Sequence, residues 1–358
     1  MKFYKRLAAT LFSVGAMGVG VAQSDTPRVD VSPYGQVNLG YMLGETGEGT
    51  ESYIVDNLNS MSRIGTWVRG SFDDTGITVG AHIELGYVQN PSNAVSPDNR
   101  NISGEFRDRQ LNIFVEGDYG KFSLGQGDGA ANNNTIADLS GTNVVSFTNP
   151  AVVGGGLPFV DRTTGEGVSL RNAVSNLDFE GRYSRIRYDA PSIGPVDFSM
   201  SHGVKSSSDV TEVGARFSAP VAGRLIARIG YSVRDVGDIT GDVETVGGSV
   251  SWLHDSGVSL TAAYSESSDD NVENPRSSFY WGKAGYRINE YHAVDIHYSE
   301  TSDLSVRGDR AESVGVGYVY TPNRWLDVYA GYRNHALSRV EADYDDVNVL
   351  MLGSRIRF

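Results

Sequence analysis

Residues 224–234 read Arg-Leu-Ile-Ala-Arg-Ile-Gly-Tyr-Ser-Val-Arg, and apolar residues alternate strictly with polar ones along most of this stretch. One face holds Leu225, Ala227, Ile229, Tyr231 and Val233, and the other holds Arg224, Arg228, Ser232 and Arg234. A period of two with one apolar face predicts a half-buried β-strand. Residues 77–87 and 326–333 repeat the pattern, with His82 and Arg333 on their polar faces. Strands of this kind therefore recur along the chain.

Short turns and longer polar loops alternate between these strands. The short turns contain Gly, Asp, Asn and Pro and lie at residues 73–76, 117–120, 192–195, 220–223, 254–257, 288–290 and 321–323. The longer loops lie at residues 44–60, 89–104, 129–180, 205–209, 235–242, 267–276, 302–309 and 336–345. Seven turns and eight loops make fifteen connections and predict sixteen strands. Alternating connection lengths are typical of a membrane β-barrel.

The N-terminus predicts export. Lys2, Lys5 and Arg6 precede an apolar stretch from Leu7 to Ala22, which is the pattern of a secretory signal peptide. The stretch is short for a membrane-spanning helix, so we expect cleavage after Ala22, with residues 1–22 as the signal peptide. The exported residues 23–358 contain no Pro-rich or Ser-rich linker, and we expect one domain although the length alone suggests two. Soluble periplasmic, secreted and membrane-barrel proteins all remain compatible with export.

The charge and the cysteine count exclude several classes of protein. The formal charge of −14 becomes −17 once the three basic residues of the signal peptide are removed. Nucleic acid is therefore not an expected partner, because phosphate binding needs a basic surface. The absence of cysteine excludes disulfides and thiolate metal sites. Stability must come from sheet closure and packing.

A Gly-Tyr pair recurs near the ends of the predicted strands. Its six tyrosines lie on the apolar faces and are Tyr41, Tyr87, Tyr231, Tyr286, Tyr318 and Tyr332. Tyrosines in these positions predict the aromatic belt where a barrel meets lipid headgroups, although a soluble β-protein could use them in its core. A barrel of sixteen strands is wide enough to leave a water-filled channel lined by its polar faces.

The order of several motifs resembles the general porin family of Gram-negative bacteria. The motifs are Tyr34-Gly35-Gln36, Ser62-Arg63-Ile64-Gly65, Gly70-Ser71, Arg109-Gln110-Leu111, residues 120–126, residues 185–192 and the C-terminal residues 353–358. The terminal Phe358 is similar to the signal that the outer-membrane barrel assembly machinery reads. The resemblance implies an all-β transmembrane antiparallel barrel in the outer membrane, assembled as a homotrimer, with no cofactor. It implies passive diffusion of small hydrophilic solutes and ions.

The resemblance also implies a constriction. In this family a long third loop folds inward, and residues 129–180 are the only loop long enough for this. The acidic residues of the loop that are expected at the constriction are Asp138, Asp161, Glu166 and Asp178. Facing them, the family carries wall arginines, whose matches here are Arg63, Arg182, Arg185 and Arg187. Arg224, Arg228 and Arg333 are further expected lumen-facing residues. Opposed charges across a narrow pore favour polar solutes over apolar ones.

Two positions depart from the family's pattern. Gln36 stands where many members carry a basic residue on the first strand, and Gln126 stands where they carry an arginine. Residues 157–161 match the family's loop signature only in part. The sequence therefore leaves open whether anions or cations pass preferentially.

Other chemistry is set aside on the spacing of its residues. The histidines are scattered, and Asp295, His297 and Ser299 at spacing two are read as a polar stripe rather than a catalytic triad, so no enzyme is expected. The acidic clusters at residues 269–273 and 341–346 lack the spacing of a calcium loop. Divalent ions could still bridge them to lipopolysaccharide phosphates. A substrate-specific channel and a closed structural or adhesive barrel remain alternative functions.

Overall fold

The protein is described by a computed structural model that covers residues 28–72, 74–237, 241–269, 274 and 276–358. The predicted signal peptide, residues 1–22, lies outside these residues. No helix in the described part of the chain is long and apolar enough to cross a membrane.

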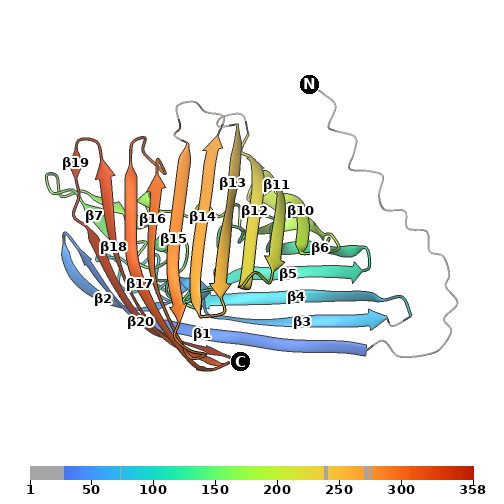
Figure 1. Cartoon of the computed structure of the whole chain (residues 1–358). Helices are drawn as coiled ribbons and strands as arrows, with labels where there is room; N and C mark the ends of the chain where they lie inside the picture. The colour runs from blue at the N-terminus through green and yellow to red at the C-terminus, as the bar shows by residue number, and fades with distance from the viewer. Residues whose placement is uncertain (1–27, 73, 238–240, 270–273, 275) are drawn as a thin grey trace.

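Nearly all of the regular structure is antiparallel β-strand (Figure 1). The first strands are β1 (Arg28–Thr46), β2 (Gly49–Asp56), β3 (Arg63–Phe72), β4 (Ile77–Val88), β5 (Glu105–Gly117) and β6 (Gly120–Asp128). They are followed, after a long connection, by β9 (Arg182–Asp189), β10 (Val196–Lys205), β11 (Ser208–Ala219), β12 (Gly223–Asp235), β13 (Asp242–His254), β14 (Val258–Asp269) and β15 (Ser277–Arg287). The last are β16 (His292–Ser302), β17 (Arg310–Asn323), β18 (Leu326–Arg339), the two-residue β19 (Ala342–Asp343) and β20 (Val347–Arg357).

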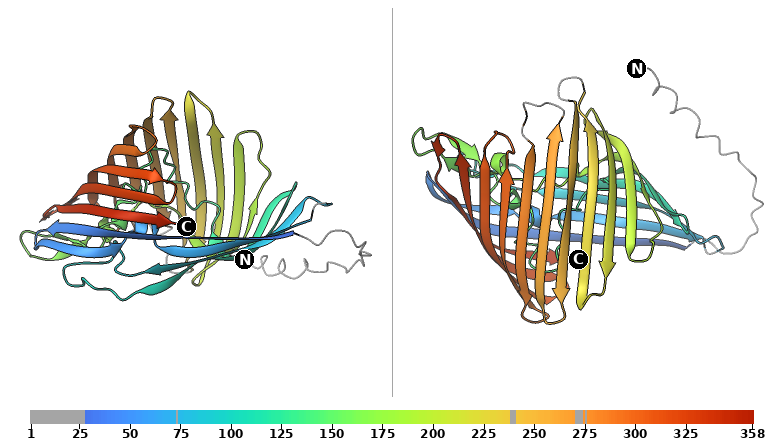
Figure 2. Two further views of the ribbon diagram at one scale, coloured as in Figure 1. Left: turned by 90° about the horizontal axis from the view of Figure 1, so that it is seen from below. Right: turned by 45° about the horizontal axis from the view of Figure 1, so that its top comes forward.

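The sheet closes into a barrel because β1 pairs with β20 on one edge and with β2 and β3 on the other. Figure 2 shows the last strands, in red, beside β1, in blue. The sheet contains eighteen strands. Two of them, β2 and β3, follow each other along one edge of β1 and together occupy one position. The two-residue β19 belongs to the hairpin that follows β18 and adds no position. The barrel therefore has sixteen strand positions, which confirms the predicted fold.

The gap between β2 and β3 is an excursion of residues 57–62 that includes the 3-10 helix η1 (Leu58–Ser60). Gln36 of β1 holds it, since its amide nitrogen donates to the carbonyl oxygens of Ser60 at 2.6 Å and Met61 at 2.9 Å. Gln36 is one of the two positions where the sequence departs from the porin pattern. In this barrel Gln36 holds the backbone of the excursion, and a longer cationic side chain would not make the same two hydrogen bonds.

Alternation along the strands separates the two faces of the barrel. Outward-facing residues such as Ile113, Ile229 and Met200 are 60%, 58% and 55% exposed. The opposite face is polar and buried, and includes Ser201, Ser232, Ser249, Ser251, Thr261, Ser265 and Ser299. An apolar outside around a polar inside is the reverse of a soluble sandwich, so the tyrosines and aliphatic residues outside cannot be core residues.

Three of the predicted long loops are wrong. Residues 44–60 form a tight reversal at residues 47–48 followed by β2, and Gly49 adopts a φ of +125° there. Residues 206–207 alone join β10 to β11, and residues 340–341 turn β18 into β19. Polar composition suggested loops at these places, but strands that project beyond a membrane can be polar on both faces. The short turn predicted at residues 321–323 also moves, to residues 324–325, because β17 runs on to Asn323.

The one very long connection runs from Asp128 to Arg182, close to the predicted loop of residues 129–180. It contains the 3-10 helix η2 (Pro150–Val152), the hairpin of β7 (Pro158–Val160) with β8 (Gly167–Ser169), and the single-turn helix α1 (Leu170–Ala173). Much of it is buried: Leu157, Phe159 and Leu170 are each 0% exposed. These apolar residues pack with Met42, Tyr53 and Met351 of the barrel wall, so the segment is an ordered part of the fold.

Candidate functional site

The wall formed by β3, β4 and β5 carries a compact charged cluster on its polar face. Arg63 Nε lies 3.1 Å from Glu84 Oε2, and Arg109 Nε lies 2.5 Å from Glu84 Oε1. Tyr34 of β1 donates its hydroxyl hydrogen to Glu84 Oε2 at 2.8 Å. Glu84 is thus shared by two arginines, and the cluster carries a net positive charge.

A second group of arginines stands at the start of β9. Arg182 Nε lies 2.9 Å from Asp128 Oδ1. Arg185, only 6% exposed, donates to the carbonyl oxygens of Gly125 at 3.0 Å and Asp128 at 3.1 Å. Arg187 pairs with Asp189 at 2.6 Å and donates to the carbonyl oxygen of Gly129 at 2.8 Å. Arg185 and Arg187 therefore fasten the point where segment 129–180 leaves the wall.

Segment 129–180 follows the polar face of the other half of the barrel. Its beginning contacts β10 and β11, where the amide of Ala130 donates to Ser201 Oγ at 2.8 Å and that of Ala131 to Glu212 Oε2 at 3.0 Å. Further along, the amides of Ala137 and Leu139 donate to the hydroxyl oxygens of Ser249 and Ser251 on β13. The serines of the wall thus hold the backbone of the segment.

Two buried basic residues help to hold the middle of the segment. Lys283 of β15 lies 2.6 Å from Asp138 Oδ2, and the side chains are 1% and 3% exposed. Its ammonium also donates to the carbonyl oxygen of Ser146 at 2.5 Å. Arg333 of β18 donates to the carbonyl oxygens of Phe147 at 2.8 Å and Pro150 at 3.1 Å. Arg333 was predicted to face the lumen, and its contacts make it an anchor of the segment.

Val144, in the first third of the segment, contacts the excursion between β2 and β3. Asn57 and Asn59 each donate a side-chain N–H to the carbonyl oxygen of Val144, at 2.8 and 3.1 Å. A polar cavity of about 300 Å³ lies beside this contact, and Asp138, Arg287, Asp327 and Arg355 are among its lining residues. The contacts of the segment thus extend from β10 to β18 and on to residues 57–59.

The four predicted acids of the segment have different surroundings. Asp138 pairs with Lys283, as described. Asp178 is half-buried and accepts hydrogen bonds from Thr135 Oγ1 at 2.7 Å and from the amide of Asn133 at 3.0 Å, and desolvation raises the pKa of its carboxyl. Asp161 accepts from the amides of Thr163 and Thr164, which lower its pKa.

Glu166, the fourth acid, is exposed on the β7–β8 hairpin. The same hairpin carries Arg162, which pairs with Asp343 at 3.0 Å and Asp345 at 2.7 Å. This end of the segment therefore contacts the last hairpin of the barrel. The ion pairs described for Arg63, Arg182 and Arg187 are with acids of the wall or of strand ends, namely Glu84, Asp128 and Asp189.

A family model described as Gram-negative porin matches residues 8–338. The chain belongs to this family. It is a porin, a β-barrel channel of the outer membrane, and the resemblance found in the sequence is confirmed. No curated protein sequence matches it.

Solved structures of several outer-membrane proteins have the same fold. The anion-selective porin from Comamonas acidovorans is 14% identical, with a TM-score of 0.69 over 92% of this chain and 100% of that one. The trimer form of OmpT, an outer membrane protein of Vibrio cholerae, is 17% identical, with a TM-score of 0.61 over 92% and 99%. The outer membrane channel DcaP of Acinetobacter baumannii is 15% identical, with a TM-score of 0.57 over 92% and 97%. At these identities the likeness concerns the fold alone.

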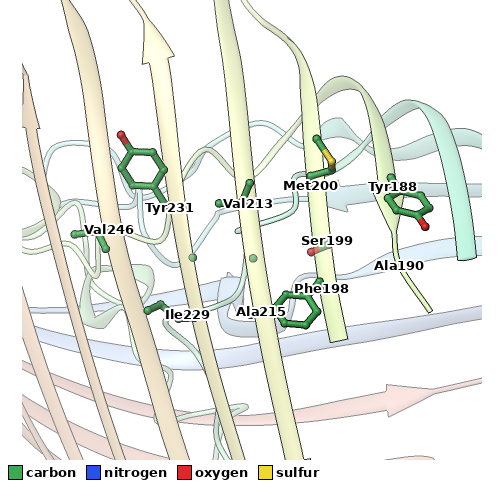
Figure 3. A pocket seen from close by; sticks show the side chains of 12 residues that line it. Tyr188, Ala190, Phe198, Ser199, Met200, Val213, Ala215, Ile229, Tyr231 and Val246 are labelled. Atoms are coloured by element: carbon green, nitrogen blue, oxygen red, sulfur yellow. The ribbon is translucent and has the colours of Figure 1, made fainter. Parts of the chain in front are cut away.

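The outer surface of the porin carries the six tyrosines of the Gly-Tyr pairs. All are between 37% and 46% exposed and lie on the apolar face. An apolar hollow of about 500 Å³ lies on the same face over β9 to β13 (Figure 3). Figure 3 shows Phe198, Met200, Ile229 and Tyr231 around the small side chain of Ala215. The hollow is on the outside of the wall and takes no part in the channel.

The C-terminal Phe358 closes the seam of the barrel. Its amide donates to the carbonyl oxygen of Gly35 at 3.0 Å, and its carbonyl oxygen accepts from the amide of Gly35 at 2.8 Å. The ring lies over Gly35, where any Cβ would meet it at 2.6 Å. The ring is 68% exposed on the outside.

Sequence reasoning missed several residues of the site. Glu84, Arg109, Asp128 and Lys283 form its ion pairs, and Arg216 of β11 donates to Asn134 Oδ1 at 3.2 Å. The alternation along β4 and β15 shows which face of each strand is polar, and Glu84 and Lys283 lie on those faces. The partner of each charge, however, comes from a distant part of the sequence. The other residues expected in the lumen, Arg224 and Arg228, lie on the inner face of β12, and Arg228 donates to the carbonyl oxygen of Asn133 at 3.0 Å.

Proposed function

We propose that this porin is a passive diffusion channel whose water-filled lumen is narrowed by segment 129–180 folded inward. The observation that carries the proposal is the course of the segment's hydrogen bonds along the polar face, from Ser201 of β10 to Arg333 of β18. A sixteen-stranded barrel is too wide to be filled by its own side chains, so a segment held on the inner face narrows the passage without closing it.

The charges on the two sides of the proposed constriction differ. The wall at β3 to β5 carries Arg63, Glu84 and Arg109, with one acid for two arginines. On the side of the segment, Asp138 is neutralised by Lys283, whereas Asp178 has hydrogen-bond partners and, among the described residues, no ion pair. We propose that Arg63 and Arg182 act on permeating ions, that Arg185 and Arg187 mainly position the segment, and that Asp178 is the acid of the segment that opposes them. Asp161 and Glu166 belong to the outer part of the segment, at the β7–β8 hairpin.

Catalysis is not part of the proposal. The only candidate constellation from the sequence, Asp295, His297 and Ser299, lies on β16, and His297 Nδ1 is 2.6 Å from Asp295 Oδ1. The other ring nitrogen, Nε2, accepts a hydrogen bond from Arg333 Nε at 3.0 Å. A general base needs that nitrogen free to receive a proton from a nucleophile. The pair instead orients Arg333 toward the segment.

The family and the surface of the channel suggest how it is exported, assembled and held in the outer membrane. We propose export by the signal peptide of residues 1–22, recognition of Phe358 by the barrel assembly machinery, and a homotrimer. A trimer form of the similar OmpT from Vibrio cholerae supports the last point. The exposed acids near Glu341 and Asp346 suit contacts with lipopolysaccharide through divalent cations.

Removing the charge of Glu84 should shift selectivity toward anions. In the Glu84→Gln variant, the side chain keeps its shape and one accepting oxygen, but the negative charge that neutralises Arg63 and Arg109 is lost. A unit charge acts on an ion roughly 4 Å away with about 1 kcal/mol in water, so we expect the chloride-to-potassium permeability ratio to rise about fivefold. The measurement is the reversal potential across a planar bilayer in a potassium chloride gradient.

The matched control is Glu290→Gln, which removes the same charge from the exposed turn at residues 288–291. At 0.1 M salt, exposed charges farther than about 10 Å from the permeating ion are screened, so this variant should stay close to the native ratio. Equal shifts in both variants, or none in Glu84→Gln, would show that Glu84 does not face the path of the ions.

A further inference from the structure

Glu212 of β11 holds both ends of segment 129–180. Its Oε2 accepts a hydrogen bond from the amide of Ala131 at 3.0 Å, and its Oε1 accepts one from the amide of Glu180 at 3.3 Å. The side chain of Glu212 is 0% exposed. One carboxylate thus joins the beginning of the segment to its end, and this pair of hydrogen bonds is hereafter called the clasp.

The clasp lies where the segment turns inward. Strands β6 and β9 pair up to Asp128 and Arg182, and a chain that continued straight from them would leave the barrel. Instead both chains cross β10, where the amide of Ala130 donates to Ser201 Oγ at 2.8 Å, and reach β11. Glu212 therefore stands at the place that both chains reach after they have turned into the lumen.

A glycine makes room for the clasp. Any Cβ on Gly129 would overlap with Glu212 Oε2 and would meet the ring of Tyr183 at 2.7 Å. The amide of Gly129 also donates to the carbonyl oxygen of Gly181 at 3.0 Å, which joins the two chains directly. A side chain at residue 129 would therefore push the carboxylate away from the amide of Ala131.

The chemistry of the clasp requires a carboxylate. Two N–H groups need two acceptor oxygens, and an ionised Glu offers two acceptors and no donor. Gln offers one acceptor and an amide NH₂ that would face an N–H group. Burying a charge is costly unless the charge is paired and hydrogen-bonded. The two amides therefore explain why a carboxylate is tolerated at this buried position.

The cations near the clasp are already paired with another acid. Lys205 of β10 and Arg234 of β12 each lie 3.0 Å from the carboxylate of Glu180. Glu212 itself is in no ion pair within the part of the chain that the structure describes. Tyr183 of β9 donates to or accepts from Ser201 at 2.9 Å. The backbone of the segment, and not a cation, is thus the partner of Glu212.

The clasp encloses the acid that the proposed constriction uses. Asp178 lies two residues before Glu180 and accepts hydrogen bonds from the amides of Asn133 and Thr135, at 3.0 and 3.1 Å. These two residues follow Ala131 closely along the other chain. The contacts of Asp178 therefore require the two chains to stay side by side, and Glu212 is a wall residue that bonds to both.

The backbone beside the clasp is strained. Asn133, Leu177 and Phe179 have φ angles of +69°, +48° and +48°, a region that residues other than glycine rarely adopt. Such conformations cost free energy and persist only where the surrounding contacts hold them. All three residues lie close to Ala131 or Glu180 along the chain. Without the clasp we expect the two chains to relax and Asp178 to move.

We infer that Glu212 is a positioning residue of the channel, whose carboxylate turns both ends of segment 129–180 inward and thereby fixes the place of Asp178. Glu212 does not meet the permeating ions, because its side chain is fully buried. The inference rests on the proposed function, in which Asp178 acts on these ions, and it adds the residue that sets the position of Asp178.

Hydrogen–deuterium exchange of the detergent-solubilised full-length protein, read by mass spectrometry, tests the clasp itself. In Glu212→Gln, peptides with residues 129–135 and 177–181 should exchange about tenfold faster or more, because one amide loses its acceptor and the other loses a charged partner. Glu212→Asp keeps the charge but is too short to reach both amides, so the same acceleration is expected. Residues 145–152, which other wall residues hold, should exchange as in the native protein.

The matched control is Asp209→Asn, which removes a charge from the exposed outer face of the same strand. Exchange of the segment should stay native in this variant. Native exchange in both Glu212 variants would overturn the inference. Acceleration in Asp209→Asn as large as in Glu212→Gln would also overturn it, because the effect would then come from charge in general.

Reversal potentials in planar bilayers separate a positioning role from a direct effect on ions. Asp178→Asn should raise the chloride-to-potassium permeability ratio by about twofold or more, and Glu212→Gln should raise it in the same direction. The double variant should not exceed Asp178→Asn alone, because Glu212 acts through Asp178. Additive shifts would show that Glu212 acts on the ions by itself and would contradict the inference.

The two measurements also separate the inference from the proposed function. If exchange accelerates in Glu212→Gln while Asp178→Asn keeps the native ratio, the role proposed for Asp178 is wrong and the clasp is supported. If Asp178→Asn shifts the ratio while exchange in Glu212→Gln stays native, the clasp is wrong and the role of Asp178 is supported.

Discussion

Replacing Lys283 with methionine is expected to detach segment 129–180 from the barrel wall while the barrel stays folded. The ammonium of Lys283 binds Asp138 Oδ2 and the carbonyl oxygen of Ser146, and both side chains of the ion pair are almost fully buried. Removing one partner of a buried pair leaves an unpaired charge and costs about 3 to 5 kcal/mol. Asp138 can escape this cost only if its part of the segment moves into water.

Limited proteolysis of the detergent-solubilised protein measures this release. In the Lys283→Met variant, cleavage within segment 129–180 should become fast, while the barrel still shows the electrophoretic mobility of a folded protein before heating. Lys283→Arg keeps the positive charge and is the matched control, with cleavage near the native rate. If Lys283→Met were as resistant as the native protein, the ion pair would not be what holds the segment.

Shortening segment 129–180 is expected to raise the single-channel conductance. A variant in which a short Gly-Ser linker replaces residues 141–175 keeps the contacts of Ala130, Ala137 and Leu139 with β10 and β13. It removes η2, β7, β8 and α1 from the inner face. A barrel of sixteen strands encloses an aqueous channel, and removing most of the segment from it widens the passage. We therefore expect the single-channel conductance to increase about twofold or more.

The matched control replaces residues 303–309, the loop between β16 and β17 at the same end of the barrel, with the same linker. Its conductance should remain native, because this loop joins two strands at their ends and touches the segment through the hydrogen bond from Ser305 Oγ to the carbonyl oxygen of Asn172. The shortened variant also exposes apolar wall residues such as Met42 and Tyr53, so the heat-dependent mobility shift must confirm that it is folded. A folded variant with unchanged conductance would mean that the segment does not narrow the pore.

The sequence predicts much of the barrel because a strand's period of two is a local property. The alternation at residues 224–234 lies within β12, and the arginines and tyrosine lie on the faces expected. The sixteen positions also follow, although residues 44–60 were assigned to a loop. There β2 projects past the break at residues 57–62, and neither composition nor period distinguishes a polar projecting strand from a loop.

The partners across the lumen could not be predicted from the sequence. Arg63 and Arg182 carry a polar-face pattern, but their acids are Glu84 and Asp128, and the acids expected in segment 129–180 have other contacts. Which residues of a long irregular segment meet which strand depends on its path through space, and no periodic pattern records that path. Lys283, which binds Asp138 across 145 residues, shows the difficulty most clearly.

The conductance of the native protein in planar bilayers tests the central claim most directly. Purified protein added to a bilayer in potassium chloride should insert in discrete steps of uniform size, each an open channel whose current rises linearly with the salt concentration and does not saturate. This is the behaviour of a water-filled pore narrowed but not closed by segment 129–180. A correctly folded barrel that inserts without any stepwise current would contradict the account.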